Sequence, residues 1–470
     1  MLANMKKMVI IASYFKGETY GLLGPQMAAT VIQENTSCDC IVIGVAREDD
    51  KALLKKAMND YFGRHRPIIG FSSLGGRPDL IDLARELSTE GAFTLLAGPQ
   101  ADVDYKGEVQ WDEWPHRFRG VSNAFPVALH GPAEQAIELL KDLERAGRGK
   151  IPGLLSQKGE TDVSYYPRNP WDDRFLSRVN WGNIYRIENG GLRPHRIRTG
   201  QVLQQIGCPH ASQEKWVEID APNNLTSRNR PPVRVRLKGC SFCDVAADKG
   251  FYGALGMGAV LNQIQCLPER PDGSKIPFEL INENALVTLP RLIVETAQAG
   301  IGLSQINLTL RADWLLKGEG RLREALDLAR TMRIRILLAS VGFESFDDAI
   351  LRNLNKGLCV ETNLAAMGLM RRLKEEFPDE WGYARSDGAN HGFIHPTPWD
   401  TEETWANIKD IIERHRLAAD IIPDHSIPLI IHHASGLGDW IREVETREGI
   451  RYGRLGSIIE WWQEIGQGPG

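Results

Sequence analysis

Two short stretches, Gly207-Cys208-Pro209-His210 and Gly239-Cys240-Ser241-Phe242-Cys243, contain three of the seven cysteines of the chain. Residues 211–238 separate them, and polar and apolar residues alternate there on both sides of a turn-rich stretch. This pattern predicts an inserted β-hairpin. Because a hairpin returns the chain to its starting point, we expect Cys208 to lie close to Cys240 and Cys243.

Three neighbouring thiolates allow several kinds of site. They can hold an iron–sulfur cluster with one open iron, since fully ligated clusters normally use four cysteines. Cys208, His210, Cys240 and Cys243 could instead form a closed zinc site. A redox-active Cys-x-x-Cys pair is a third interpretation, and chance proximity is a fourth. The spacing alone leaves all four open.

The chain around these cysteines alternates strand and helix patterns. Residues 201–425 contain six β/α units, which predict a partial (β/α)6 barrel with its site at the carboxyl ends of the strands. Residues 426–470 form a C-terminal extension. The expected strands are Val202–Ile206, Phe278–Ile281, Gln305–Leu310, Arg335–Val341, Gly392–His395 and Ile427–His432. The expected helices are Tyr252–Cys266, Leu289–Ala299, Gly320–Thr331, Glu361–Glu376 and Glu402–His415.

Residues 1–150 show the same alternation, with continuous apolar strands separated by helical stretches. This predicts an α/β domain with a doubly wound, Rossmann-like parallel sheet. Ligands of such sheets bind beyond the carboxyl ends of the strands. Small residues occupy those positions, and they include Ser72, Ser73, Gly98 and Gly131. Residues 151–200 are expected to form an irregular linker.

Composition excludes several classes of protein. The chain has 470 residues and a formal net charge of −5, which argues against a nucleic-acid coat or a polybasic membrane anchor. No stretch approaches the roughly 20 apolar residues of a membrane span. The apolar run Met8–Phe15 is better explained as a buried strand than as a signal peptide. Because an odd, low number of cysteines argues against a disulfide framework, we expect a cytoplasmic protein.

The order of the motifs resembles a known family, the radical S-adenosylmethionine (SAM) enzymes that carry an N-terminal cobalamin-binding domain. The family's Cys-x3-Cys-x2-Cys motif is split here by the insertion. Three N-terminal segments resemble the cobalamin module, namely Ile69–Ser73, Leu96–Gln100 and His130–Glu134, although the chain has no Asp-x-His-x-x-Gly motif. The barrel segments that resemble the family are Asn282–Asn284, Leu310–Asp313, Gly342–Ser345, Leu354–Gly357, Gly392–Pro396 and Asp400–Thr404.

The resemblance implies three cofactors and assigns residues to each. A 4Fe-4S cluster would be held by Cys208, Cys240 and Cys243. Cobalamin would be bound by Ser72, Ser73, Gly98 and Gly131. S-adenosylmethionine would be contacted by Asn282, Glu283, Asn284, Arg311, Glu344 and Ser345.

The resemblance also implies radical chemistry, with C-methylation of an unactivated carbon in a small molecule as the leading activity. A cobalamin-dependent rearrangement or cyclisation is the alternative within the family, and a zinc-stabilised corrinoid- or nucleotide-binding module without catalysis is the alternative outside it. A one-electron reductant such as ferredoxin or flavodoxin would be a partner. Residues 186–238 contain ten Lys or Arg and four Asp or Glu, which suits an anionic substrate, a wall around the phosphates of the cofactors, or simply a solvated face of the hairpin. Nucleic acid is not expected, because few aromatic residues interleave these basic residues.

Overall fold

The chain forms a mixed α/β structure that divides into two compact units. The first comprises Met1–Gly200, Asn262–Pro268 and Leu455–Ser457, and the second comprises the remaining residues. Each is described by itself. The computed structural model describes residues 7–73, 77–101, 124–129, 131–144, 154–156, 173–225, 230–243, 251–421, 426–455 and 457–467.

An eight-stranded, mostly parallel sheet is the centre of the first unit, with strand order β6-β5-β4-β3-β1-β2-β7-β8. Strands β1 to β5 and β7 run parallel to their neighbours, whereas β6 and β8 pair antiparallel at the edges. The order of the chain reverses between β1 and β3. The strands are β1 Lys7–Ser13, β2 Asp39–Val45, β3 Ile68–Ser72, β4 Thr94–Ala97, β5 Val127–Leu129, β6 Leu154–Ser156, β7 Ile184–Glu188 and β8 Gly191–Pro194.

Helices cover this sheet, as the apolar strands predict. Buried side chains of α2 and α3 share one core cluster with Val9 and Ile11 of β1 and with Phe71 of β3. On α2, the Asp50 carboxylate accepts hydrogen bonds from the N–H groups of Ala52 and Leu53, which caps the first turn. The helices are α1 Leu23–Asn35, α2 Lys51–Phe62, α3 Pro78–Thr89 and α5 Gln135–Glu144.

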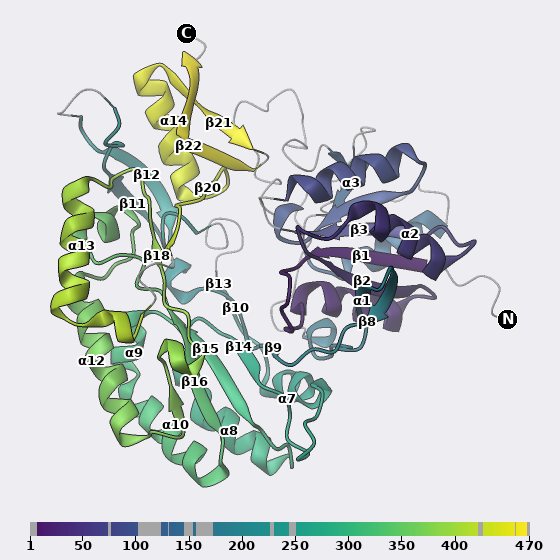
Figure 1. The fold of residues 1–470 in the computed structure, drawn as a ribbon, viewed down its shortest axis with the longest axis horizontal. Helices are drawn as coiled ribbons and strands as arrows, with labels where there is room; N and C mark the ends of the chain where they lie inside the picture. The colour runs from purple at the N-terminus through teal and green to yellow at the C-terminus, as the bar shows by residue number, and fades with distance from the viewer. Residues whose placement is uncertain are drawn as a thin grey trace. The chain divides into compact units, whose positions relative to one another are not determined.

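A five-stranded sheet organises the second unit, and its order β9-β14-β15-β16-β17 follows the chain. Pairing from β14 to β17 is parallel, and α8, α10 and α12 lie along one side of the sheet (Figure 1). The strands are β9 Gly200–Leu203, β14 Phe278–Ile281, β15 Gln305–Leu310, β16 Arg335–Val341 and β17 Trp381–Gly382. The helices are α7 Met257–Cys266, α8 Leu289–Gln298, α9 Ala312–Lys317, α10 Glu319–Met332, α11 Asp348–Asn353, α12 Val360–Glu376 and α13 Glu402–Arg414.

The inserted hairpin is confirmed. Strands β11 (Glu214–Ile219) and β12 (Val233–Lys238) pair antiparallel, with Glu214 opposite Lys238. Alternate residues of β12 are buried, and Leu237 lies so close to Gly436 of α14 that a Cβ there would come within 2.9 Å of its side chain. Helix α14 (Gly436–Glu448) packs beside a three-stranded sheet, whose strands are β20 Ile431–His432, β21 Ile450–Leu455 and β22 Ile458–Gln467.

Three expectations need correction. The helix expected from Tyr252 begins only at Met257, because β13 (Phe251–Ala254), which contains Gly253 at φ 113°, pairs with β10 (Gln205–Gly207). Part of the expected linker forms β7 and β8. The last two expected β/α units do not extend the five-stranded sheet: β18 (Phe393–Ile394) and β19 (Ser426–Ile427) form a separate parallel pair.

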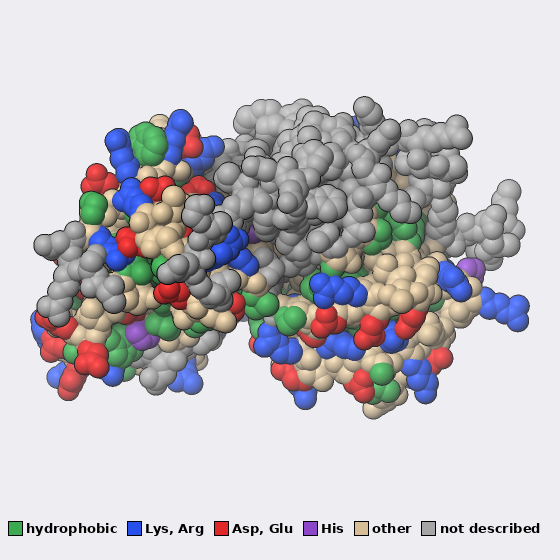
Figure 2. Space-filling view, turned by 90° about the horizontal axis from the view of Figure 1, so that it is seen from above, with side chains coloured by type: hydrophobic (Ala, Val, Ile, Leu, Met, Phe, Trp, Pro, Cys, Tyr) green, Lys and Arg blue, Asp and Glu red, His purple; other side chains and the backbone are tan. Residues whose placement is uncertain are grey.

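Charged side chains of both signs are mixed over the described surface that Figure 2 shows. Ion pairs between exposed side chains also occur, such as Arg85 with Asp82 at 3.0 Å and Arg321 with Glu324 at 2.8 Å. None of the described helices is both long enough and apolar enough to cross a bilayer.

Candidate functional site

Polar side chains follow three neighbouring parallel strands of the second unit. Asn282 comes directly after β14, Arg311 after β15, and the Gly342–Ser345 segment after β16. The carboxyl ends of parallel strands lie at the same edge of a sheet. The contacts below show that these residues and the loops that carry Cys208 and Cys240 converge there.

Arg311 is the centre of this convergence, and it is buried. Its Nη2 donates a 2.5 Å hydrogen bond to the carbonyl oxygen of Lys356, and its Nε donates to Asp313 at 3.0 Å. Its Nη1 lies 3.7 Å from Sγ of Cys240. The Cys240 thiol therefore faces a guanidinium group.

Lys356 adds a second buried cation, and its Nζ donates a 2.7 Å hydrogen bond to Oε1 of Glu344. Burial alone would lower the pKa of Lys356, but the charges of Glu344 and Cys240 raise it overall. Glu344 has φ 62°, a left-handed conformation that is costly for a residue with a side chain and that clusters at functional sites. A Cβ at Gly342 would come within 2.8 Å of both charged groups, so glycine gives them room.

Cys208 and Cys240 lie within electrostatic reach of one another. Burial and the negative charges of Glu283 and Cys240 raise the pKa of the Cys208 thiol. Burial also raises the pKa of the Cys240 thiol, while Lys356 and Arg311 oppose this shift. The two cations thus favour the thiolate form at Cys240, which is the form that binds metals.

The third cysteine is Cys243, which is half-buried and whose N–H donates to the carbonyl oxygen of Cys240 at 3.2 Å. Among the residues that the structure describes, no three His, Cys, Asp or Glu side chains are grouped closely enough to hold one metal ion. His210 directs Nε2 to the carbonyl oxygen of Asn355 at 3.3 Å. The four residues of the zinc interpretation therefore do not lie close enough together to bind one zinc ion.

The expected distances between the sulfur atoms differ between a zinc site and an iron–sulfur cluster. Sulfur atoms bound to one zinc ion lie roughly 4 Å apart, because each Zn–S bond is about 2.3 Å. Thiolates that bind separate irons of a cluster lie farther apart. The three cysteines lie on two adjacent loops, and the buried cations Arg311 and Lys356 lie beside Cys240, where they would offset the negative charge of thiolates.

The segment after β14 is tied to the neighbouring strand. Nδ2 of Asn282 donates a 2.7 Å hydrogen bond to Oε1 of the buried Gln204, and Oδ1 of Asn282 accepts from the N–H of Asn284. Glu283 is exposed, yet desolvation by the surrounding protein raises the pKa of its carboxyl, with Lys356 and Arg311 opposing the shift. Glu283 is the most exposed of the three residues.

Ser345, which is predicted to contact SAM, makes contacts within its own turn. It is buried, and its Oγ accepts a 3.1 Å hydrogen bond from the N–H of Asp347. The amide of buried Asn363 also donates to the carbonyl oxygens of Phe343 and Ser345. Ser345 shapes the turn that presents Glu344. Lys356 belongs to a segment that resembles the family, but nothing in its sequence position alone showed that it pairs with Glu344.

In the first unit, three of the four predicted cobalamin-binding residues lie together. Ser72 ends β3, Ser73 follows it, and the carbonyl oxygen of Ser73 accepts a hydrogen bond from the N–H of Gln100. Gly98 follows β4 with φ 77°, and a Cβ there would come within 2.8 Å of Oγ of Ser72. Gly131 follows β5, while His130 lies outside the described residues.

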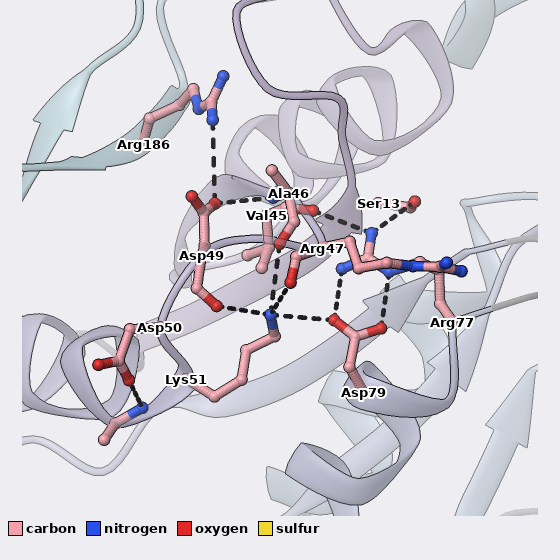
Figure 3. Close-up of polar contacts among 11 residues, drawn as sticks. Ser13, Val45, Ala46, Arg47, Asp49, Asp50, Lys51, Arg77, Asp79 and Arg186 are labelled. Carbon is pink, nitrogen blue, oxygen red and sulfur yellow. Dashed lines mark hydrogen bonds and ion pairs between the residues drawn. The ribbon is translucent and has the colours of Figure 1, made fainter.

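The sequence analysis missed a charged network at the carboxyl ends of β1 and β2 (Figure 3). Buried Arg77 donates from Nη1 to Oγ of Ser13 and to the carbonyl oxygen of Val45, and forms a two-pronged ion pair with Asp79. Lys51 lies 3.0 Å from Asp79 and donates to carbonyl oxygens of the loop after β2. With these donors satisfied within the protein, the network fastens the loop after β2 to Arg77 and Asp79 at the start of α3.

Comparison with known proteins shows no family for this chain. No protein-family model matches the chain, and no curated protein matches its sequence significantly. What the chain does must therefore be argued from its own residues.

Proposed function

We propose that this protein is a radical SAM enzyme that modifies an unactivated carbon of a small molecule, with methyl transfer as its leading activity. One observation carries the proposal: Cys240 lies beside the buried cations Arg311 and Lys356 at the carboxyl edge of a parallel sheet. Glu344, Glu283 and Cys208 belong to the same electrostatic neighbourhood. The resemblance assigns a cofactor to each of these residues except Lys356, which lies in the resembling segment Leu354–Gly357 without an assigned role.

Cys208, Cys240 and Cys243 would hold a 4Fe-4S cluster. Such a cluster with one open iron, given one electron by an external reductant, would supply from bound SAM a carbon-centred radical able to remove hydrogen from an unactivated carbon. The chain's own contribution near the cysteines is electrostatic. Arg311 and Lys356 offset the negative charge of the thiolates in a partly desolvated environment, where such charges act strongly.

The same residues offer a place for the amino-acid part of SAM, which carries an ammonium and a carboxylate group. Glu283, exposed and without a direct ion pair among the described contacts, can accept from the ammonium group. Arg311 and Lys356 provide positive charge for the carboxylate, and Asn282 fixes the loop. This assignment keeps Asn282, Asn284 and Ser345 as residues that position the loops.

We further propose that the first unit is a Rossmann-like cobalamin-binding domain and that the second is a partial (β/α)6 barrel. The strand order β2-β1-β3-β4-β5 supports the first assignment, because it is the doubly wound order of flavodoxin-like sheets. Such sheets bind flat or phosphate-bearing ligands beyond their carboxyl ends, next to the point where the strand order reverses. Ser72, Ser73 and Gly98 lie at that edge.

Metal analysis tests the proposal. The full chain would be purified without oxygen and with cobalamin supplied, and its iron, sulfide, cobalt and zinc would be measured. About four irons with equal sulfide are expected, together with one cobalt. Iron without cobalt would keep the radical chemistry but remove methyl transfer as its leading activity. Zinc alone would overturn the enzyme assignment.

A further inference from the structure

His395 lies at the same edge of the second unit as Glu344 but has no assigned role. It directly follows β18, and β18 is joined to the candidate site through its backbone. Phe393 pairs with Glu344 in a parallel bridge, and the N–H of Ile394 donates to the carbonyl oxygen of Glu344 at 2.9 Å. One residue farther along, His395 lies on the carboxyl side of Glu344.

The ring of His395 is held on two sides. Its Nδ1 lies 2.9 Å from Oδ2 of Asp400, and its face is stacked on Trp405 of α13, with ring centroids 4.0 Å apart and planes 5° apart. Oδ2 of Asp400 also accepts a hydrogen bond from the N–H of Thr397, which fixes the carboxylate. A carboxylate can accept a hydrogen bond from Nδ1 only if that nitrogen carries the hydrogen. The neutral ring then has a lone pair on Nε2.

Two polar atoms of this pair have no partner among the described residues. Oδ1 of Asp400 is buried and unsatisfied, and no group in the described part of the chain accepts from or donates to Nε2 of His395. The two side chains differ in access, since His395 is 25% exposed and Asp400 only 10%. An accessible imidazole nitrogen backed by a buried carboxylate is the arrangement of a general acid–base pair.

We propose that His395 and Asp400 form a proton-transfer dyad. Nε2 of His395 accepts a proton from an O–H, N–H or acidic C–H group of a bound small molecule, which keeps the bonding electron pair. Asp400 holds the ring and stabilises the imidazolium, and the proton then leaves from Nε2 to solvent. The dyad needs no other co-reactant. The role of the dyad in turnover rests on the proposed function, but its ability to transfer a proton does not.

His391 provides an internal control for the tautomer. Its Nδ1 accepts a hydrogen bond from the N–H of Val341 at 2.9 Å, and its Nε2 lies 2.6 Å from the carbonyl oxygen of Tyr383. Nε2 of His391 must therefore carry the hydrogen, the reverse of His395. His391 is also buried, so it should not react with reagents in solution.

Nitrogen NMR of the full chain labelled at histidine tests the tautomer without any cofactor. We expect His395 with hydrogen on Nδ1 and His391 with hydrogen on Nε2 in the same spectrum. Asp400→Asn should move His395 away from the Nδ1–H form and leave His391 unchanged. A His395 that carries hydrogen on Nε2 in the unmodified protein would overturn the dyad.

Diethyl pyrocarbonate, which modifies unprotonated imidazole nitrogens, tests whether Nε2 can be reached. We expect His395 to react at least tenfold faster than His391, and Asp400→Asn to slow its reaction severalfold. Equal rates at His395 and His391 would contradict the proposal. His395→Gln should remove the adduct, which confirms its assignment.

Turnover separates a catalytic role from a merely structural one. His395→Gln should lower SAM-dependent product formation about 100-fold, a typical contribution of acid–base catalysis, with SAM affinity and thermal stability unchanged. The matched control is His415→Gln, at an exposed histidine. Equal turnover in both variants would overturn the catalytic role. An unmodified protein that does not cleave SAM would refute the proposed function instead, and the two measurements above would still decide the dyad.

Discussion

Nζ of Lys356 lies 2.7 Å from Oε1 of Glu344, and a Cβ at Gly342 would approach both atoms to within 2.8 Å. The ion pair therefore lies directly over the backbone at the end of β16. Both partners are largely removed from solvent, with 6% of the Lys356 side chain and 19% of the Glu344 side chain exposed. This pair links two loops of the candidate site.

Replacing Gly342 by Ala should push the ion pair apart. We expect a loss of about 1–2 kcal/mol in the free energy of unfolding, as for other overpacked positions, measured by urea denaturation. Gly320→Ala is the control, because a Cβ there meets nothing within 4 Å. That variant should be as stable as the parent or slightly more so. Equal effects at the two glycines would show that the pair does not depend on Gly342.

Replacing both members of the pair should lower the free energy of unfolding by less than the sum of the two single replacements. Lys356→Met leaves the Glu344 carboxylate without its partner, and we expect a loss of about 3 kcal/mol. Glu344→Gln should also destabilise the protein, because it leaves the buried ammonium group of Lys356 without its partner. The double variant should lose less than the sum of the single losses, because no isolated charge remains. Additive losses in urea denaturation would mean that the two charges do not interact.

Stability should depend on pH through Asp79 in the first unit. Burial would raise the pKa of its carboxyl, but Arg77 and Lys51 lower it overall. A lowered folded-state pKa contributes stability above the ordinary Asp value of about 3.9, and this contribution is lost as pH falls through the folded-state pKa. Asp79→Asn should therefore cost about 2 kcal/mol at pH 7 and clearly less at pH 3.

Asp82→Asn is the matched control for this test. Asp82 forms an ion pair with Arg85, and both side chains are more than 60% exposed. Such surface pairs contribute little to stability, so we expect a change below about 0.5 kcal/mol at either pH. If Asp79→Asn behaved like Asp82→Asn, the network around Arg77 would not stabilise the loops.

Gly98 should be needed for cobalamin binding by the first unit. An alanine there would adopt an unfavourable φ of 77° and would press on Oγ of Ser72. We expect Gly98→Ala to retain at least tenfold less cobalamin than the parent, measured by absorbance after desalting. Gly63→Ala has similar strain at φ 60° but no neighbour within 4 Å, so it should bind normally. Equal retention by both variants would contradict the assignment.

Much of the second sheet could be predicted from sequence. The strands β14, β15 and β16 have the predicted bounds, because each is an apolar or alternating run between clear helical patterns. Strand β17 was missed, since two residues are too few to carry a pattern. The helix start at Tyr252 was wrong because β13 is held by pairing with β10, which is a tertiary interaction.

The candidate site could be predicted only in part. Arg311 and Glu344 were predicted from the resemblance, and the structure places both shortly after neighbouring parallel strands. The contacts of Lys356 with Glu344, 12 residues apart, and of Arg77 with Ser13, 64 residues apart, depend on how the loops fold against one another. No local pattern encodes such contacts. The buried hydroxyl of Ser345 likewise reveals its structural role only through its hydrogen bond to Asp347.

Electron paramagnetic resonance of the reduced, anaerobically purified protein, with and without SAM, tests the central claim most directly. An open iron predicts a cluster signal that changes when SAM is added. Cys240→Ala should lose the signal and most of the iron, whereas the control Cys359→Ala, at an exposed cysteine, should keep both. A cluster signal that SAM leaves unchanged, or iron retained by Cys240→Ala, would contradict the account.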